Sequence, residues 1–86
     1  MEILQSIFFN KNKYNLETAK KYLLNNNYGK YKRINEDKYY IRFTFNSRIK
    51  LQKNNYIKEI EFLGDDIKIF RYTKENKEPN FTIIFD

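Results

Sequence analysis

The sequence predicts a single α+β domain in which one amphipathic helix packs on a mainly antiparallel sheet, in the order β-α-β-β-β-β-β. Most of the chain consists of short segments rich in Ile, Phe and Tyr, in which apolar and polar residues alternate as in β-strands. Only the segment from residue 16 to residue 27 has apolar residues at helical spacing. A chain of 86 residues has room for one hydrophobic core, so residues 1–86 form one predicted domain.

The first two predicted elements are a strand and the helix. Residues 2–9 are apolar and rich in Ile and Phe, which is typical of a strand. Asn15 is the predicted N-cap, because its side chain can accept a hydrogen bond from a free amide of the first turn. Glu17 lies in that turn, where the helix dipole favours negative charge. The helix, about twelve residues long, ends at the asparagines of 25–27 or at Gly29, either of which can adopt a positive φ.

Two hairpins are predicted to follow. Residues 30–35 and 38–46 form the first, around a polar turn at the junction of the two segments. Residues 56–63 and 67–72 form the second, around Gly64, which reaches a left-handed conformation without a Cβ penalty. The sequence therefore predicts that most of the sheet is antiparallel.

Three further segments complete the predicted chain. Residues 47–55 are a loop or an irregular edge segment, 73–80 are a charged turn whose proline stops a strand, and 81–85 are a last strand. If the first strand paired in parallel with a later one, the helix would be their right-handed crossover. The predicted core is Ile3, Ile7, Phe9, Leu16, Ala19, Leu23, Ile41, Phe43, Phe45, Ile60, Phe62, Ile67, Ile69, Ile83 and Phe85.

One helix cannot cover both faces of such a sheet, so one face stays partly open. The strand at 38–46 indicates what that face carries, because neighbouring side chains of a strand point to opposite sides. Tyr39, Ile41, Phe43 and Phe45 share the predicted core side. Tyr40, Arg42 and Thr44 share the other side, which combines a cation with aromatic and hydroxyl groups.

The basic residues around this strand form the predicted binding site. The net charge is +6, but Asn, Lys, Ile, Tyr and Phe are all written with AT-rich codons, so genome bias explains part of the lysine excess. Arginine is better evidence, and its planar fork suits bidentate binding of anions. Phosphates would contact the cations and bases would stack on the tyrosines. The predicted site residues are Tyr31, Lys32, Arg33, Tyr40, Arg42, Arg48 and Lys50.

Several classes of chemistry have no support in the sequence. The chain has no cysteine and no histidine, which excludes thiolate metal sites and the common catalytic triads. It has two glycines and no phosphate-binding glycine motif. Asp65 and Asp66, with Glu59 or Glu61, could begin a Mg²⁺ site, but such a pair beside a glycine is more typical of a hairpin turn. We therefore expect no enzyme activity, no metal and no cofactor.

The expected partners are DNA or RNA, or a host protein that handles nucleic acid. An inhibitor of a host defence enzyme and a minor structural or assembly subunit are the alternatives, although an inhibitor that occupies a nucleic-acid groove normally carries carboxylates. The sequence is compatible with a homo-oligomer as well as with a monomer. No apolar run approaches the ~20 residues of a membrane helix, and the N-terminus lacks the features of a signal peptide. A soluble protein inside the cell is therefore expected.

Two segments, IFFNKNKYNLETAKKYLLNNNY and DKYYIRFTF, carry a resemblance to a known domain. The first half of the chain resembles a small uncharacterised domain of giant-virus and tailed-phage proteins. In that group a lysine and an aromatic residue precede a helix with an Ala-x-x-aromatic-Leu core, and a Tyr-x-Arg-(Phe/Tyr) strand follows. This chain has tyrosine where tryptophan is usual. The resemblance implies a viral or phage setting, in the host cytoplasm or the virion. The matching residues are Lys13, Tyr14, Ala19, Tyr22, Leu23, Tyr40, Arg42 and Phe43.

Overall fold

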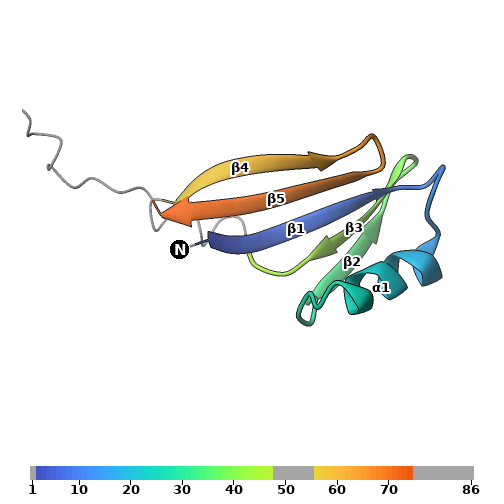
Figure 1. The fold of residues 1–86 in the computed structure, drawn as a ribbon, viewed down its shortest axis with the longest axis horizontal. Helices are drawn as coiled ribbons and strands as arrows, with labels where there is room; N and C mark the ends of the chain where they lie inside the picture. The colour runs from blue at the N-terminus through green and yellow to red at the C-terminus, as the bar shows by residue number, and fades with distance from the viewer. Residues whose placement is uncertain (1, 48–55, 75–86) are drawn as a thin grey trace, which may run out of the picture.

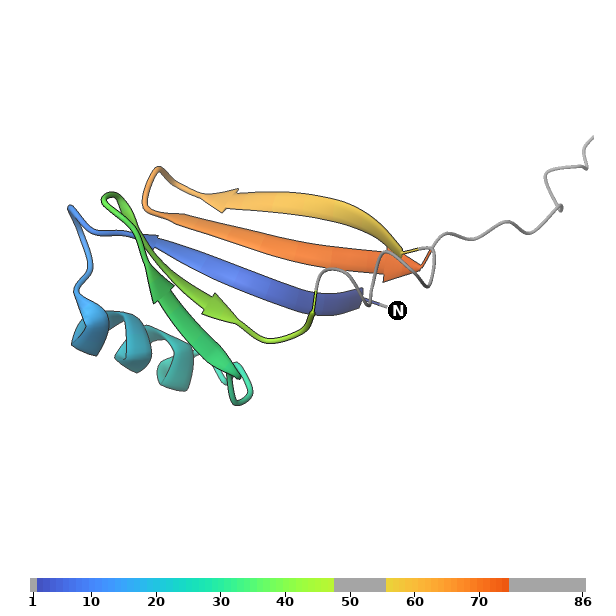
Figure 2. The ribbon, with the colours of Figure 1, turned by 180° about the vertical axis from the view of Figure 1, so that it is seen from behind.

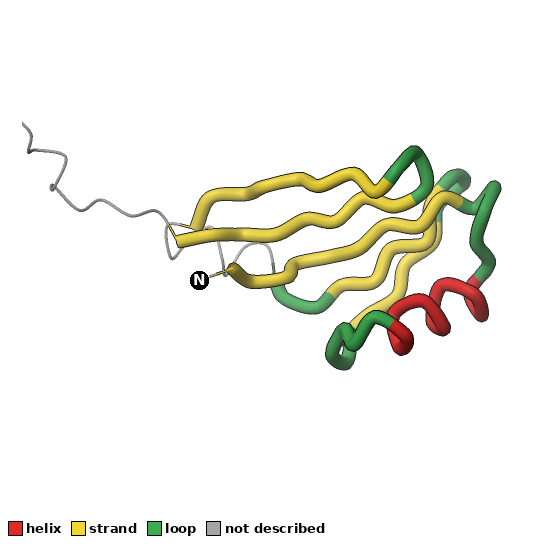
Figure 3. Tube along the Cα trace, in the orientation of Figure 1, coloured by secondary structure: helices red, strands yellow, loops and turns green. Residues whose placement is uncertain are grey.

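The computed structural model describes residues 2–47 and 56–74, which form one helix and one five-stranded antiparallel sheet (Figure 1, Figure 3). This confirms the predicted α+β class. The predicted strand at 81–85 and nearly all of the predicted loop at 47–55 lie outside the described residues. The elements are β1 (Glu2–Asn10), α1 (Leu16–Asn25), β2 (Arg33–Glu36), β3 (Tyr40–Thr44), β4 (Tyr56–Leu63) and β5 (Ile67–Lys74).

β1 lies at the centre of the sheet, whose strand order is β2-β3-β1-β5-β4. It pairs antiparallel with β3 on one side and with β5 on the other. α1 therefore does not connect parallel strands, and the conditional expectation of a crossover helix does not apply. Gln5 is an extra residue in β1, because the pairing with β5 shifts between Leu4 and Ser6.

α1 begins and ends at the predicted asparagines. The Asn15 side chain accepts a hydrogen bond from the Thr18 amide at 2.8 Å, and the Thr18 hydroxyl accepts one from the Asn15 amide at 2.9 Å. This reciprocal pair is a capping box, which satisfies two otherwise free amides. After the helix, Asn27 adopts a φ of 58°, the left-handed conformation expected in this segment.

The core lies between α1 and one face of the sheet. In both ribbon views α1 lies beside β2 and β3 and away from β4 (Figure 1, Figure 2). The ring of Tyr22 packs edge-on against that of Phe9, with centroids 5.6 Å apart. Nine predicted core residues are buried: Ile7, Phe9, Ala19, Leu23, Ile41, Phe43, Phe45, Ile67 and Ile69.

Other parts of the core prediction are wrong. Ile60 and Phe62 are 46% and 64% exposed, because β4 is the last strand of the described sheet and the register places both side chains on the side opposite α1. Leu16 is also exposed, and Ile3 is only partly buried. Tyr72, which the prediction omitted, is buried. The predicted core residues Ile83 and Phe85 lie outside the described residues.

Both predicted hairpins are present, with small changes in their limits. β2 begins at Arg33 rather than at Lys30, and β5 continues to Lys74, where the sequence predicted a turn from Thr73. Gly64 has a φ of 63° at the turn between β4 and β5, as its position predicted.

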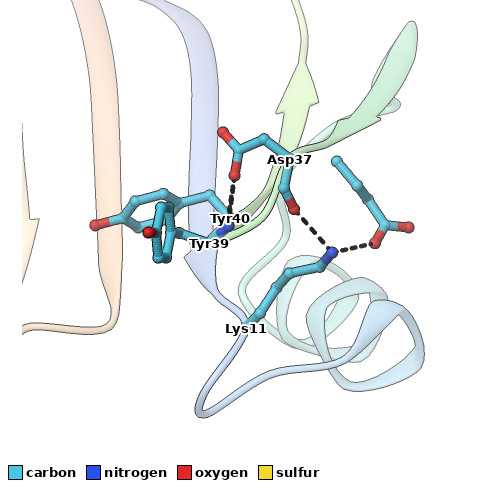
Figure 4. A network of polar contacts seen from close by, with 5 residues as sticks. Lys11, Asp37, Tyr39 and Tyr40 are labelled. Atoms are coloured by element: carbon cyan, nitrogen blue, oxygen red, sulfur yellow. Dashed lines mark hydrogen bonds and ion pairs between the residues drawn. The ribbon is translucent and has the colours of Figure 1, made fainter.

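Asp37 organises the turn between β2 and β3 (Figure 4). Its carboxylate accepts hydrogen bonds from the amides of Tyr40 and Tyr39, each at 2.7 Å. The Lys11 ammonium donates to the Asp37 carbonyl at 2.9 Å and pairs with Glu36 at 3.0 Å. The turn is thereby tied to the end of β1.

These hydrogen bonds from Tyr40 and Tyr39 lower the pKa of Asp37 below its ordinary value of 3.8. Because the pKa is lower in the folded state, the ionised carboxylate stabilises the fold at neutral pH, and this contribution is lost as the pH falls below about 4. We expect Asp37→Asn to lower the melting temperature at neutral pH and to approach the parent protein in acid. Melting curves across this range test it, with Asp65→Asn as the control. A difference in melting temperature between the parent and Asp37→Asn that does not change with pH would contradict the expectation.

Candidate functional site

The two faces of the sheet differ in what they carry. One face packs against α1 and is called the helix face. The strand registers place alternate residues on the opposite side, called the open face. The open face includes Ile3, Ser6, Phe8 and Asn10 on β1, Arg33 and Asn35 on β2, Tyr40, Arg42 and Thr44 on β3, Tyr56, Lys58, Ile60 and Phe62 on β4, and Lys68, Phe70 and Tyr72 on β5.

Charge is segregated between these faces. The register places every glutamate of the five described strands on the helix face: Glu2, Glu36, Glu59 and Glu61. The open face carries cations instead: Arg33, Arg42, Lys58 and Lys68. Within the described strands, the open face therefore carries arginine and lysine but no glutamate.

Three aromatic rings form a row across the middle of the open face. Phe8 is central, with its ring centroid 6.0 Å from that of Tyr40 and 5.0 Å from that of Phe70. Each of the three side chains is partly exposed. These residues come from β3, β1 and β5, so the row exists only because these strands are neighbours. We call Tyr40, Phe8 and Phe70 the aromatic row.

Cations lie over these rings. The Lys68 ammonium is 4.2 Å from the centroid of Tyr40 and 5.1 Å from that of Phe8. The Arg42 guanidinium lies 5.2 Å from the Phe8 centroid, and the Lys58 ammonium lies 5.2 Å from that of Phe70. Attraction between a cation and the electron-rich face of a ring stabilises this arrangement. Basic and aromatic groups are thus interleaved.

Arg71 on the helix face has a different environment. Its guanidinium donates to Glu61 and lies 3.8 Å from the Glu2 carboxylate. Partial burial lowers the pKa of Arg71, but the hydrogen bond and charge of Glu61 outweigh this effect and raise it above its ordinary value. Arg71 is therefore a cation that is paired with carboxylates of neighbouring strands on the helix face.

A basic pocket of about 430 Å³ lies at one end of the open face. Lys32, Arg33 and Arg42 supply its charge. Among the residues that the structure describes, the others that line it are polar: Gln5, Thr44, Asn46 and Ser47. Arg42 lines the pocket and its guanidinium lies over the Phe8 ring, so the pocket and the aromatic row adjoin.

Most of the described site residues lie where the sequence predicted. Tyr40, Arg42 and Arg33 are on the open face, and Lys32 borders the basic pocket. Tyr31 does not join them. Its ring packs edge-on against buried Phe43, with centroids 5.0 Å apart, because residues 30–32 are not in a strand and strand alternation does not orient them. The predicted site residues Arg48 and Lys50 lie outside the described residues.

The sequence prediction also assigned Tyr39 to the core side of its strand, and this is wrong. Tyr39 precedes β3 and is 63% exposed. For Ile41, Phe43 and Phe45 the predicted burial is confirmed.

Several residues of the open face were not predicted from the sequence. Phe8, Lys58, Lys68 and Phe70 were not among the predicted site residues. A signal existed for β5, where Lys68 and Phe70 alternate with the apolar Ile67 and Ile69. For Phe8 there was none, because it adjoins an equally apolar Phe9 and only strand pairing shows which of them faces α1.

The described residues also bear on other kinds of site. Asp65 and Asp66 follow Gly64 in the β4–β5 turn, which is the structural role predicted for them. Residues 2–47 and 56–74 hold no group of three or more acidic side chains placed to bind a metal ion. The helix in this part of the chain lacks the length and apolar character to cross a membrane.

No protein-family model, curated protein or solved structure matches this chain. The resemblance to a viral and phage domain stays a prediction. A functional assignment must therefore be argued from the geometry and charge of the open face.

Proposed function

We propose that this protein binds single-stranded nucleic acid on the open face, without catalysing a reaction. The observation that carries the proposal is the combination of Tyr40, Phe8 and Phe70 in one row with cations around them, on a face without glutamate in the described strands. Phosphates are attracted by the cations and bases by the rings. An anionic partner fits this face better than a neutral one.

A single strand suits the aromatic row better than a duplex. In a duplex the faces of the bases are covered by their stacked neighbours, whereas an unpaired base can place its face on a protein ring. Stacking of this kind is worth about 1–3 kcal/mol per base and tolerates any sequence. The row therefore favours binding with little sequence preference, to DNA or RNA.

The cations have two roles in this proposal. In the free protein, Lys68 and Lys58 lie over the rings and shelter them from water. Lysine has a flexible four-carbon stem, so each ammonium can leave its ring for a phosphate when a base takes its place. Binding then exchanges cation–ring contacts for base–ring and cation–phosphate contacts.

The biological setting that we propose is an accessory protein of a virus or phage, acting in the host cytoplasm or in the virion. The resemblance in residues 7–28 and 37–45 supports this setting. In this setting the protein would act only by binding to nucleic acid and covering it.

A protein partner is the second candidate, and β4 is the observation that favours it. β4 is a terminal strand of the described sheet with apolar residues on both faces: Ile57, Ile60, Phe62 and Leu63, which are 48%, 46%, 64% and 37% exposed. A partner could add a strand to such an edge. Affinity for nucleic acid should fall steeply with rising salt, whereas an apolar protein contact should persist.

Two arginines on opposite faces provide a matched test. We expect Arg42→Ala to weaken binding of an oligothymidylate of about ten nucleotides by about 1–3 kcal/mol, because a phosphate contact is lost beside the aromatic row. Arg71→Ala should leave the affinity nearly unchanged, since Arg71 is already paired with Glu61. Fluorescence anisotropy at several salt concentrations measures both, with RNA and DNA strands.

The salt dependence checks the electrostatic part. The slope of log affinity against log salt should decrease by about one for Arg42→Ala. Equal effects of the two alanine variants, or binding that does not depend on salt, would count against the open face as the site.

A further inference from the structure

The Thr44 hydroxyl is an unusual group in the basic pocket. Thr44 is only 5% exposed, and its hydroxyl oxygen has no hydrogen-bond partner among residues 2–47 and 56–74. A buried hydroxyl without a partner is unfavourable, and nearly all buried polar groups in folded proteins have one. The side chain borders the pocket, so a ligand there could accept its hydrogen bond.

The groups around Thr44 are suited to an anion. Arg33 lies directly opposite Thr44 on the neighbouring strand, and Arg42 lies two residues earlier on the same face of β3. Lys32 is held beside them, because its amide donates to the Thr44 carbonyl at 2.7 Å. Guanidinium forks bind phosphate oxygens in pairs, and an ammonium binds them as a point charge.

Hydrogen bonds hold the wall of the pocket in place. The buried Gln5 side chain donates to the Asn46 carbonyl at 3.0 Å, and the Asn46 side chain donates to the Leu4 carbonyl at 2.7 Å. The Phe45 amide donates to the Gln5 carbonyl at 2.8 Å. The extra residue in β1 thus fixes the segment after β3, and a ligand would meet a preformed wall.

From these observations we infer that the pocket binds a phosphate group, with the Thr44 hydroxyl as a donor and Lys32, Arg33 and Arg42 as the charge. The inference rests on the proposed function in one respect, since the phosphate would belong to the strand on the aromatic row. In a bound strand this phosphate is either a terminal monoester or an internal diester. Free inorganic phosphate presents the same anionic oxygens to the pocket.

Thr44→Val tests this assignment, because valine keeps the branched shape and removes only the hydroxyl. We expect the affinity for a strand that carries phosphate to fall about tenfold, the loss of one hydrogen bond to a charged group. The melting temperature should stay the same or rise, since an unsatisfied buried hydroxyl is removed. Thr73→Val is the control, because Thr73 is a strand threonine on the helix face.

Three ligands separate the possible sources: an oligothymidylate with a 5′-phosphate, the same strand with hydroxyl ends, and inorganic phosphate followed by shifts of backbone NMR signals. Tighter binding of the phosphorylated strand, lost in Thr44→Val, assigns a terminal phosphate. An equal loss for both strands assigns an internal one. If no strand binds, but inorganic phosphate shifts the backbone signals of Arg33 and Arg42 in the parent and not in Thr44→Val, the phosphate pocket is supported and the nucleic-acid function is excluded.

Two results would overturn the pocket. Equal affinity of Thr44→Val and the parent for all three ligands would do so, even if strands still bind on the aromatic row. A fall in melting temperature specific to Thr44→Val would also do so, because it would mean that the hydroxyl is already satisfied in the free protein.

Discussion

Replacing Phe43 with alanine should lower the free energy of unfolding by about 3–5 kcal/mol. Phe43 is fully buried on the helix face of β3, and its ring packs edge-on against Phe9 at 5.5 Å and Tyr31 at 5.0 Å. Alanine would leave a cavity where β1, β3 and the segment before β2 meet. Urea unfolding followed by circular dichroism measures the change.

Phe62→Ala is the matched control for this substitution. It removes the same side chain from β4, where the ring is 64% exposed, so the loss should be within about 1 kcal/mol. Phe43→Leu provides an intermediate, should the alanine variant fail to fold. Similar losses for Phe43→Ala and Phe62→Ala would mean that the assignment of the two faces is wrong.

The second large effect concerns the neighbours Phe8 and Phe9. Phe8→Leu should weaken oligonucleotide binding by about 1–3 kcal/mol, because the centre of the aromatic row loses its ring while keeping apolar area. Phe9→Leu should instead lower stability, since Phe9 is fully buried and contacts Tyr14 and Tyr22 on the helix face. Anisotropy titrations and melting curves on both variants separate the two effects.

This pair distinguishes a binding role from a structural role at adjacent positions. If Phe8→Leu reduced stability and left affinity unchanged, the aromatic row would be a packing feature of the sheet. If Phe9→Leu reduced the affinity of the folded protein as strongly as Phe8→Leu, binding would not be localised to the open face.

Local signals in the sequence were sufficient for much of the fold. Asn15 and Asn27 mark the ends of α1 through their own side-chain and backbone preferences, which operate within a few residues. Gly64 marks the second hairpin for the same reason. The alternation in β3 divides Ile41 and Phe43 from Arg42, because successive strand side chains point to opposite sides.

Strand neighbours could not be predicted in this way. β4 and β5 both contain apolar, aromatic and charged residues, yet Phe62 on β4 is exposed and Tyr72 on β5 is buried. β5 pairs with β1 in the interior and β4 lies at the edge of the described sheet, and the alternation within a single strand does not reveal either position. The same limit explains why Phe8, Lys68 and Phe70 were missed as site residues.

The sequence by itself determined the fold class, the helix and its caps, both hairpins and the placement of Arg42 on the face opposite Ile41 and Phe43, since each depends on interactions between residues close along the chain. Tertiary structure alone decided that Phe8, Tyr40 and Phe70 form one row, that the strand glutamates lie on the opposite face, and that Thr44 is buried beside three cations. These features depend on which distant segments pair and in which register, and a shift of one residue would send every side chain of a strand to the other face.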